Sequence, residues 1–369
     1  MWTRLLQFIA CPFCKGDLDV FSIDAQEVAT DAIHDVRHDT ALLLCHACRY
    51  RYPVYEGLPV LLPYTTDLHK AFETTHRTQI QRFAEYSWPN EPPVEGEQFV
   101  MNSFSREWLE YDYDGIMWDL SYEDHKTRLY AELGVEKIGK HKNFLEIGSG
   151  LGMSTFFAQE ALQGEAIGVD LSVAALSASR HFRDNPFLHF IQASVFKLPI
   201  REGAVDVVYS HGVLHHTSST HKAFLSMAEC CRNGGMTYVW LYGTASLKGS
   251  PARRVAWGLE KLVRPMIARR LDSVAARAAL ATLALPYFLG NAWHRLRNPT
   301  VQPYNFQRAL HAARDRFTPL YAHRHEAAEI ASWFAEAGYR DVEQVDWRSM
   351  PAANQDNYRR NVGMRGRRM

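Results

Sequence analysis

Four cysteines near the start of the chain stand in two C-x-x-C pairs, Cys11 with Cys14 and Cys45 with Cys48. Each pair lets two thiolates approach one ion from a single tight turn, and two such turns complete a tetrahedral site of four sulfurs. Because four sulfurs leave no position for a catalytic water, the spacing predicts a structural zinc ion. A disulfide, which a reducing compartment disfavours, and an iron–sulfur centre are the alternatives.

A second stretch that could do chemistry is FLEIGSGLGMS, residues 144–154, which runs from an apolar strand through a glycine-rich turn into a helix. No lysine follows the glycines, as a triphosphate loop requires, and Met153 occupies the third glycine position of a dinucleotide fingerprint. S-adenosylmethionine carries no phosphate, so it fits this wider loop better. The candidate contacts are one acid and three glycines: Glu146, Gly148, Gly150 and Gly152.

A parallel sheet would position this loop. From residue 143 onward, strand-like and helix-like segments alternate, which predicts a doubly wound α/β sheet with ligands beyond the carboxyl ends of the strands. Asp170 ends the second strand segment, where a carboxylate can accept both ribose hydroxyls of a nucleoside. The strand segments are 143–148, 165–170, 187–193, 204–210 and 236–242, and the helix segments include 153–162, 172–182 and 220–235.

Four stretches of this region resemble the class I S-adenosylmethionine-dependent methyltransferases, in the subgroup that includes quinone and other small-molecule methyltransferases. They are FLEIGSGLGMS, GVDLS, LPIREGAVDVVYSHGVLHHT and CCRNGGMTYVWLY, and the resemblance spans about residues 140–243. It implies a seven-stranded Rossmann-like sheet whose last two strands pair as an antiparallel edge.

The resemblance also assigns roles to residues around the cofactor. Glu146 and the three glycines would surround the methionine part, Asp170 would hold the ribose, and Leu171 would flank the adenine. Family members usually have an acid near the adenine amino group, where this chain has Ser194 followed by Val195. Ser210 and His211 would face the reactive end of the cofactor.

Two adjacent histidines, His215 and His216, follow the fourth strand segment closely enough to reach a methyl acceptor. One of them could act as general base, because an unperturbed histidine titrates near pH 6.5. The same dipeptide recurs in family members with unlike substrates, so a structural role is the alternative. An acidic acceptor would need only positioning next to the sulfonium.

The fragments LLQFIACPFCKGDLDV and LLLCHACRYRYPVYEGLPVLLP resemble the zinc-ribbon activator subunit of methyltransferases that act on tRNA and translation factors. The likeness covers roughly residues 5–65. In that family the ribbon stabilises a methyltransferase and does no chemistry itself. Here it implies a stabilising domain fused to the enzyme, with a structural zinc ion.

Three regions follow from these features. Residues 1–65 form the zinc-ribbon domain, 66–140 an aromatic-rich linker and helical cover, and 141–369 the methyltransferase domain with a helical insertion at 245–300. Candidate substrate contacts outside the motifs are Tyr111, Asp112, Tyr113, Tyr321 and His323.

The insertion is strongly basic, with ten Lys/Arg against two Asp/Glu between Lys248 and Arg297. Apolar residues recur in it at helical spacing, for example Val255, Leu259, Leu262 and Met266, so we expect two or three helices that form a lid over the acceptor site. Three uses are open: a plain cap, an element that contacts a membrane surface or a lipid substrate, and a grip on an anionic substrate.

Composition narrows the function. The 369 residues carry 41 Lys/Arg and 41 Asp/Glu, so net charge gives no support for a nucleic-acid binder. The apolar stretch before Cys11 is shorter than a signal peptide requires, so we expect a cytoplasmic protein, or one peripheral at the membrane through the insertion. The expected activity is methyl transfer to oxygen or carbon of a small or lipid-like molecule. A methyltransferase acting on RNA or protein and a non-catalytic scaffold that binds S-adenosylmethionine are the alternatives.

Overall fold

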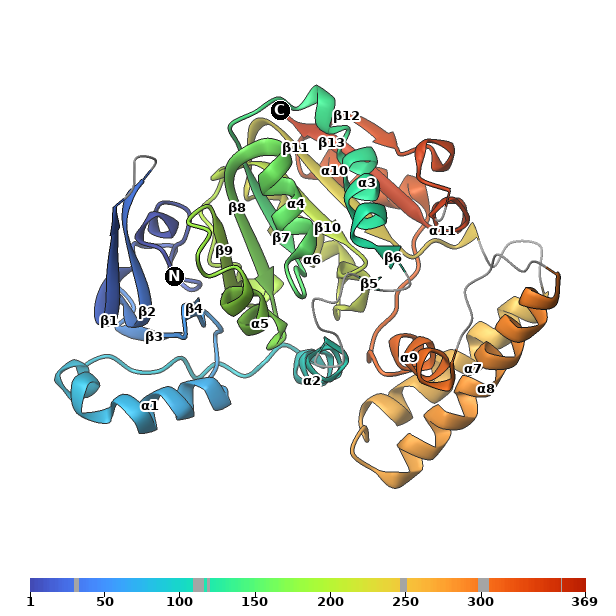
Figure 1. The fold of residues 1–369 in the computed structure, drawn as a ribbon, viewed down its shortest axis with the longest axis horizontal. Helices are drawn as coiled ribbons and strands as arrows, with labels where there is room; N and C mark the ends of the chain where they lie inside the picture. Colours follow the sequence, from blue (N-terminus) through green and yellow to red (C-terminus); the bar gives the residue numbers. More distant parts are fainter. Residues whose placement is uncertain (30–32, 109–115, 118–119, 246–250, 298–304, 353) are drawn as a thin grey trace.

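The computed structural model describes residues 1–29, 33–108, 116–117, 120–245, 251–297, 305–352 and 354–369. Two larger sheets organise the chain: a four-stranded sheet near the N-terminus and a seven-stranded sheet in the centre (Figure 1). A helical hairpin extends from the opposite side of the molecule. Among the described residues, no helix combines the length and apolar character needed to cross a membrane.

The N-terminal sheet is antiparallel, in the order β1-β2-β3-β4, and confirms the β-rich ribbon expected there. It joins the central sheet at one edge, where the N–H of Leu61 donates to the carbonyl of Gln192 at 2.8 Å. A second contact lies away from this edge, where Arg201 N–H donates to Phe8 O at 2.9 Å. The ribbon therefore covers an edge strand that would otherwise present unpaired backbone groups. Its strands are β1 (Asp19–Ala29), β2 (His34–Cys45), β3 (Tyr50–Tyr55) and β4 (Leu58–Pro59).

The central sheet has the order β12-β13-β11-β10-β7-β8-β9. All neighbours are parallel except β13, which runs antiparallel to both β11 and β12. This confirms the doubly wound seven-stranded architecture and its antiparallel edge. The strands are β7 (Lys142–Ile147), β8 (Gln163–Asp170), β9 (Leu188–Gln192), β10 (Val205–His211), β11 (Cys231–Leu241), β12 (Tyr339–Gln344) and β13 (Val362–Arg368).

Helices cover both faces of this sheet, which explains why the middle strands are apolar on both sides. One face packs against α3, α4 and α5, and the other against α6, α10 and the ribbon. The predicted helix 220–235 is shorter than expected, since it ends at Ala228 and Cys231 already begins β11. The covering helices are α3 (Tyr122–Leu133), α4 (Met153–Leu162), α5 (Ala174–His181), α6 (Thr220–Ala228) and α10 (Ala327–Glu336).

The region between ribbon and sheet contains α1 (Asp67–Ile80), which packs on the ribbon, and α2 (Glu97–Trp108), which lies beside the carboxyl ends of the central strands (Figure 1). A short hairpin of β5 (Ile116–Met117) and β6 (Leu120–Ser121) precedes α3. The side chain of Ser121 caps α3, accepting from the N–H of Asp124, and Gly134 ends the helix in the left-handed region.

The insertion forms two helices, α7 (Pro251–Ala268) and α8 (Val274–Arg297), and α9 (Phe306–Phe317) packs against both. Together they form a separate helical unit that extends away from the sheet (Figure 1). A last short helix, α11 (Gln355–Arg360), leads into β13.

Candidate functional site

The four cysteines of the ribbon converge, as predicted. The sulfur atoms of Cys11, Cys14, Cys45 and Cys48 all lie within 4.8 Å of one another. Backbone N–H groups of Gly16 and Cys48 point at the sulfurs of Cys14 and Cys45 at 3.4 Å, as in the knuckles of zinc ribbons. A tetrahedral ion with bonds of about 2.3 Å to sulfur places its ligands about 3.8 Å apart, which lies within this limit. The donor set therefore fits a structural zinc ion, which would close the ribbon and leave no position for a substrate.

The glycine-rich loop follows β7 and leads into α4. Gly148, Gly150 and Gly152 all have positive φ, at 81°, 51° and 83°. A Cβ at Gly148 would overlap a methyl carbon of Val213, and one at Gly150 would lie 2.6 Å from the ring of Trp108. Side chains at these positions are therefore excluded both by conformation and by space.

Asp170, at the end of β8, organises this loop. One carboxylate oxygen accepts from the N–H of Gly150 at 2.7 Å, and the other accepts from the N–H and hydroxyl of Ser172, both at 2.7 Å. Burial raises the pKa of Asp170, and these three donors oppose that shift. A carboxylate has about four acceptor positions, so Asp170 keeps capacity for a ribose hydroxyl.

A cavity of about 490 Å³ opens beyond the carboxyl ends of β7, β8 and β10. Its size is in the range of small-molecule sites. Of the residues proposed in the cofactor motifs and the histidine pair, seven line it: Glu146, Gly148, Asp170, Leu171, Val195, His211 and His216. Five others that were proposed do not line it: Gly150, Gly152, Ser194, Ser210 and His215.

Aromatic side chains line much of the rest of the cavity: Phe104 and Trp108 from α2, Trp240 from β11, and Tyr242 and Tyr321 beyond it. Tyr321, named from the sequence, therefore reaches the cavity. His323 is not among the lining residues. Residues 111–113, the other substrate contacts named from the sequence, lie outside the part of the chain that the structure describes.

Ser194 does not line the cavity, but it contacts a residue that does. It is fully buried, and its hydroxyl donates to the carboxyl of Glu97 on α2, which lines the cavity. Burial raises the pKa of Glu97, while hydrogen bonds from Ser194 and the N–H of Val94 oppose the shift. Glu97 thus brings a carboxyl from α2 next to Ser194.

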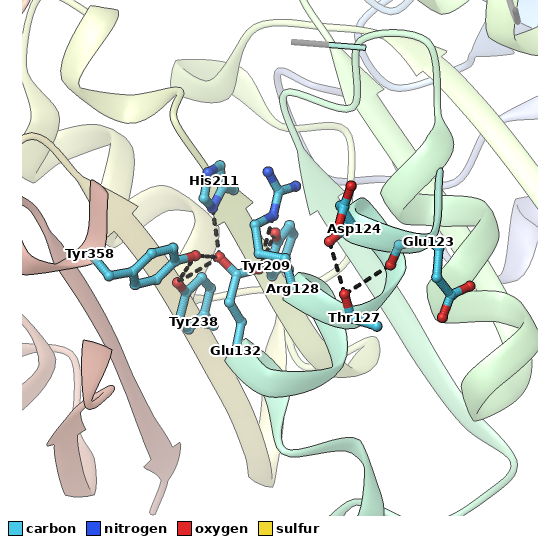
Figure 2. Close-up of polar contacts among 9 residues, drawn as sticks. All are labelled: Glu123, Asp124, Thr127, Arg128, Glu132, Tyr209, His211, Tyr238 and Tyr358. Atoms are coloured by element: carbon cyan, nitrogen blue, oxygen red, sulfur yellow. Dashed lines mark hydrogen bonds and ion pairs between the residues drawn. The ribbon is translucent and has the colours of Figure 1, made fainter. Parts of the chain in front are cut away.

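A buried carboxylate, Glu132 of α3, lies behind the cavity at the centre of a polar cluster (Figure 2). It accepts hydrogen bonds from the hydroxyls of Tyr209 at 2.6 Å, Tyr238 at 2.8 Å and Tyr358. It also lies 2.7 Å from Nδ1 of His211. Burial favours a raised pKa, but His211 and its other partners outweigh burial and hold the pKa of Glu132 below its ordinary value. Since Glu132 faces three hydroxyls, a ring nitrogen and the guanidinium of Arg128, these contacts favour its ionised form also when His211 is neutral.

His211 connects this cluster to the cavity. A carboxylate can only accept, so Nδ1 of His211 carries the proton and Nε2 is the basic nitrogen. Burial lowers the pKa of His211, the nearby Arg128 lowers it further, and Glu132 opposes both. The ring stacks on Trp240 with centroids 4.6 Å apart. A neutral histidine with a fixed tautomer thus lines the cavity, ready to accept a proton.

Arg128, one turn before Glu132 on α3, is nine-tenths buried and lines the cavity. Its Nε lies 3.8 Å from Glu132, and within the described residues this atom has no hydrogen-bond partner. Glu146 lies nearby; burial raises its pKa to about 8, and Thr155 donates a hydrogen bond to it at 2.5 Å. The cavity therefore offers a cation and an acid close together.

The two histidines proposed as bases differ. His215 is fully buried and stacked on Tyr242 at 3.9 Å, and it does not reach the cavity. His216 lines the cavity, but its Nδ1 is bonded to the carbonyl of Tyr321 at 2.7 Å and burial lowers its pKa to about 3. The geometry supports packing roles for both.

Sequence reasoning did not find Glu97, Arg128 and Glu132. The last two share one face of α3 with His125, at the spacing i, i+3 and i+7. Three polar residues on the buried face of an amphipathic helix were a usable signal, because buried charges need a partner or a function.

Two regions of the chain match models of known protein families. Residues 145–239 match the family model of a methyltransferase domain, and residues 3–57 match the Trm112p-like protein model. The UPF0434 protein of Coxiella burnetii is 40% identical over 63 residues, which are 17% of this chain and 84% of that protein. The UPF0434 protein of Vibrio atlanticus is 42% identical over 59 residues, 16% of this chain and 73% of that protein.

Solved structures of methyltransferases are similar in fold at low sequence identity. Geranyl diphosphate C-methyltransferase from Streptomyces coelicolor is 13% identical with a TM-score of 0.43, covering 76% of this chain and 100% of that one. Phosphoethanolamine N-methyltransferase 2 from Haemonchus contortus is 12% identical with a TM-score of 0.45, covering 76% of this chain and 62% of that one.

Proposed function

We propose that this chain, an S-adenosylmethionine-dependent methyltransferase whose N-terminal region belongs to the Trm112-like UPF0434 family, methylates an oxygen atom of a small, largely apolar hydroxy compound. The observation that carries the proposal is the pair of His211 and Glu132, a neutral base fixed by a buried carboxylate at the wall of a cavity of small-molecule size. The chain's residues divide the cavity into a cofactor half and an acceptor half.

The cofactor half is formed by the loop and the carboxylates near it. Asp170 would accept a ribose hydroxyl, and Glu97, fixed by Ser194, would accept from the adenine amino group. Arg128 pairs with the carboxylate of the methionine part, and Glu146 with its ammonium group. When bound, S-adenosylmethionine supplies an electrophilic methyl group. All four side chains are buried, so their interactions are strong and the bound molecule is shielded from water.

The acceptor half is formed by the aromatic wall. Rings of Phe104, Trp240 and Tyr242 would hold an apolar acceptor, and the one basic nitrogen of His211 would fix its hydroxyl group. His211 takes the hydroxyl proton at Nε2, and Glu132 stabilises the imidazolium that forms. An oxygen acceptor is favoured because a hydroxyl must lose a proton as the new bond to carbon forms.

The test is a panel of acceptors with S-adenosylhomocysteine as the measured product. We expect turnover with small hydroxylated aromatic or isoprenoid compounds, and loss of at least about a hundredfold in kcat for His211→Gln. His221→Gln is the matched control, because His221 is a half-buried histidine on α6 outside the cavity. Turnover with tRNA or protein but with no small compound would refute the proposal. Equal kcat in His211→Gln and wild type would show that His211 is not the general base.

A further inference from the structure

Helix α7 carries its apolar residues on its outer side. Val255, Leu259, Leu262 and Met266 repeat every three or four residues and so form one stripe along the helix. Their exposed fractions are 64%, 58%, 70% and 66%. We call these four residues the α7 stripe. They face away from the rest of the protein, and among the described residues of α7 and α8 none lines the cavity.

The inner side of the same helix is ionic. Glu260 and Arg264 are 4% and 5% exposed and pair with each other, and Arg316 of α9 donates to Glu260 from Nε at 2.7 Å. Helix α7 thus buries an ion pair beside Ile267 and exposes a stripe of hydrocarbon, which an ordinary surface helix does not. An exposed apolar stripe of this length indicates a surface that meets an apolar partner.

Helix α8 repeats the pattern. Leu285, Leu289, Trp293 and Leu296 also follow one another every three or four residues, and they are 45%, 62%, 60% and 80% exposed. We call these four residues the α8 stripe. Its inner side packs instead on α7 and α9, through residues such as Leu280. Both helices of the hairpin therefore present hydrocarbon outward.

Cations accompany both stripes. Residues 251–297 contain nine Lys/Arg and two Asp/Glu, an excess of seven positive charges in a chain whose total is zero. Within the hairpin, Lys261 lies over the ring of Trp257 at 3.6 Å, and Arg297 lies over that of Trp293 at 4.7 Å. Among the side chains whose burial is described, the exposed cations are Arg254, Lys261, Arg269, Arg270, Arg277, Arg295 and Arg297.

We propose that the α7–α8 hairpin docks on the surface of an anionic phospholipid bilayer, with both stripes in the acyl boundary and the cations among the headgroups. Exposed hydrocarbon, flanking Lys/Arg and tryptophan beside a cation are the features of helices that lie in this interface. Neither helix can span the bilayer, so the contact is peripheral.

Charge favours an anionic bilayer over two other partners that could cover the stripes. A second copy of the hairpin would bring two sets of seven exposed cations together, which repel each other. A nucleic acid would pair with the cations but leave the leucines against water or phosphate. A bilayer with anionic headgroups satisfies the cations and the hydrocarbon together. The inference does not depend on the methyl acceptor.

The test is co-sedimentation of the full chain with vesicles of phosphatidylcholine, alone or mixed with phosphatidylglycerol. We expect binding to the mixed vesicles that is at least tenfold stronger than to the neutral ones, on the order of fivefold per contributing cation. Leu259→Ser with Leu289→Ser should weaken binding by at least about tenfold. Met369→Ser, which removes an exposed apolar residue at the C-terminus, should not change it.

Charge reversal gives an independent arm. Lys261→Glu with Arg277→Glu should weaken binding to mixed vesicles by about tenfold or more, whereas Arg340→Glu, on β12, should not. All substituted residues are exposed, and circular dichroism checks that each variant folds. Absence of binding to either vesicle, equal binding to both, or a dimer that the two leucine substitutions dissociate would overturn the proposal.

Discussion

Replacing Glu132 with glutamine tests whether His211 acts as a positioned base or only packs against its neighbours. In the wild type, Glu132 receives three tyrosine hydroxyls and the Nδ1–H of His211, and it is ionised. A glutamine has nearly the same shape, but its amide group carries two donors and no charge. At least one side of the cluster then places a donor against a donor, and His211 loses its ionic partner.

The expected effect on catalysis follows from the role of the base. General-base catalysis contributes about a hundredfold to ten-thousandfold, so kcat should fall by about a hundredfold or more, while the affinity for S-adenosylmethionine changes little. The cost to stability should be about 1–3 kcal/mol, because buried hydrogen-bond donors lose their acceptor. The protein should therefore remain folded at room temperature but melt at a lower temperature than the wild type.

Three readouts complete this test. The double variant Glu132→Gln with His211→Gln should be no slower than His211→Gln alone, because both changes remove one function. Nitrogen-15 spectra of the histidines should show the Nδ1–H tautomer of His211 in wild type and its loss in the variant. Glu136→Gln, which changes an exposed acid just beyond the end of α3, is the control. A Glu132→Gln protein with kcat close to that of wild type and an unchanged tautomer would refute the reasoning.

Three further predictions concern metal, cofactor and pH. Purified protein should contain about one zinc per chain. Cys14→Ser should lose the zinc and melt roughly 10 °C lower, whereas Cys230→Ser, outside the cluster, should keep the zinc. A metal-free wild type as stable as the zinc-bound protein would contradict the zinc-ribbon assignment. The pKa of Glu146 is raised to about 8, so affinity for S-adenosylmethionine should rise from pH 6 towards 8, by at most about tenfold per unit. The rise should end near pH 8, because the ammonium group of the ligand also loses its proton there. A flat profile between pH 6 and about 7.5 would show that Glu146 does not pair with the ligand. Burial lowers the folded-state pKa of His69 to about 4 and of His216 to about 3, so each histidine is protonated at a higher pH in the unfolded chain than in the folded one. The free energy of unfolding should therefore fall below pH 6.5, by about 1.4 kcal/mol per pH unit for each histidine. Urea unfolding should show a smaller slope for His216→Gln, and an unchanged slope would speak against the burial of His216.

The sequence predicted those parts of the site that depend on local geometry. A glycine loop between an apolar strand and a helix has few possible conformations, so Gly148 and Asp170 could be placed before the fold was known. The four cysteines are similar, because two short turns and one ion define their arrangement.

The parts that the sequence did not predict depend on contacts between distant segments. Glu132 acts through Tyr209, Tyr238 and Tyr358, which lie 77, 106 and 226 residues away in the sequence. No local pattern connects them. Glu97 likewise meets Ser194 across 97 residues. From the sequence, Glu132 could be recognised only as a charge on the buried face of a helix.

The insertion shows a different limit. Periodicity identified Val255, Leu259, Leu262 and Met266 correctly as one face of a helix, and we expected that face to cover the acceptor site. The structure turns it outward, and α2 lies over the carboxyl ends of the strands instead. Periodicity identifies an apolar face but not the partner that covers it, and here the charged inner residues occupy the protein side.

The central claim is that the cavity beyond β7 and β8 holds S-adenosylmethionine through Asp170. Isothermal titration calorimetry of the full chain tests it most directly, with Asp170→Ala and the exposed Asp346→Ala as a matched pair, and thermal melts to confirm folding. We expect one site per chain, at least about tenfold weaker binding in Asp170→Ala, and wild-type binding in Asp346→Ala. No binding by folded wild-type protein, or equal affinity in all three proteins, would contradict the account.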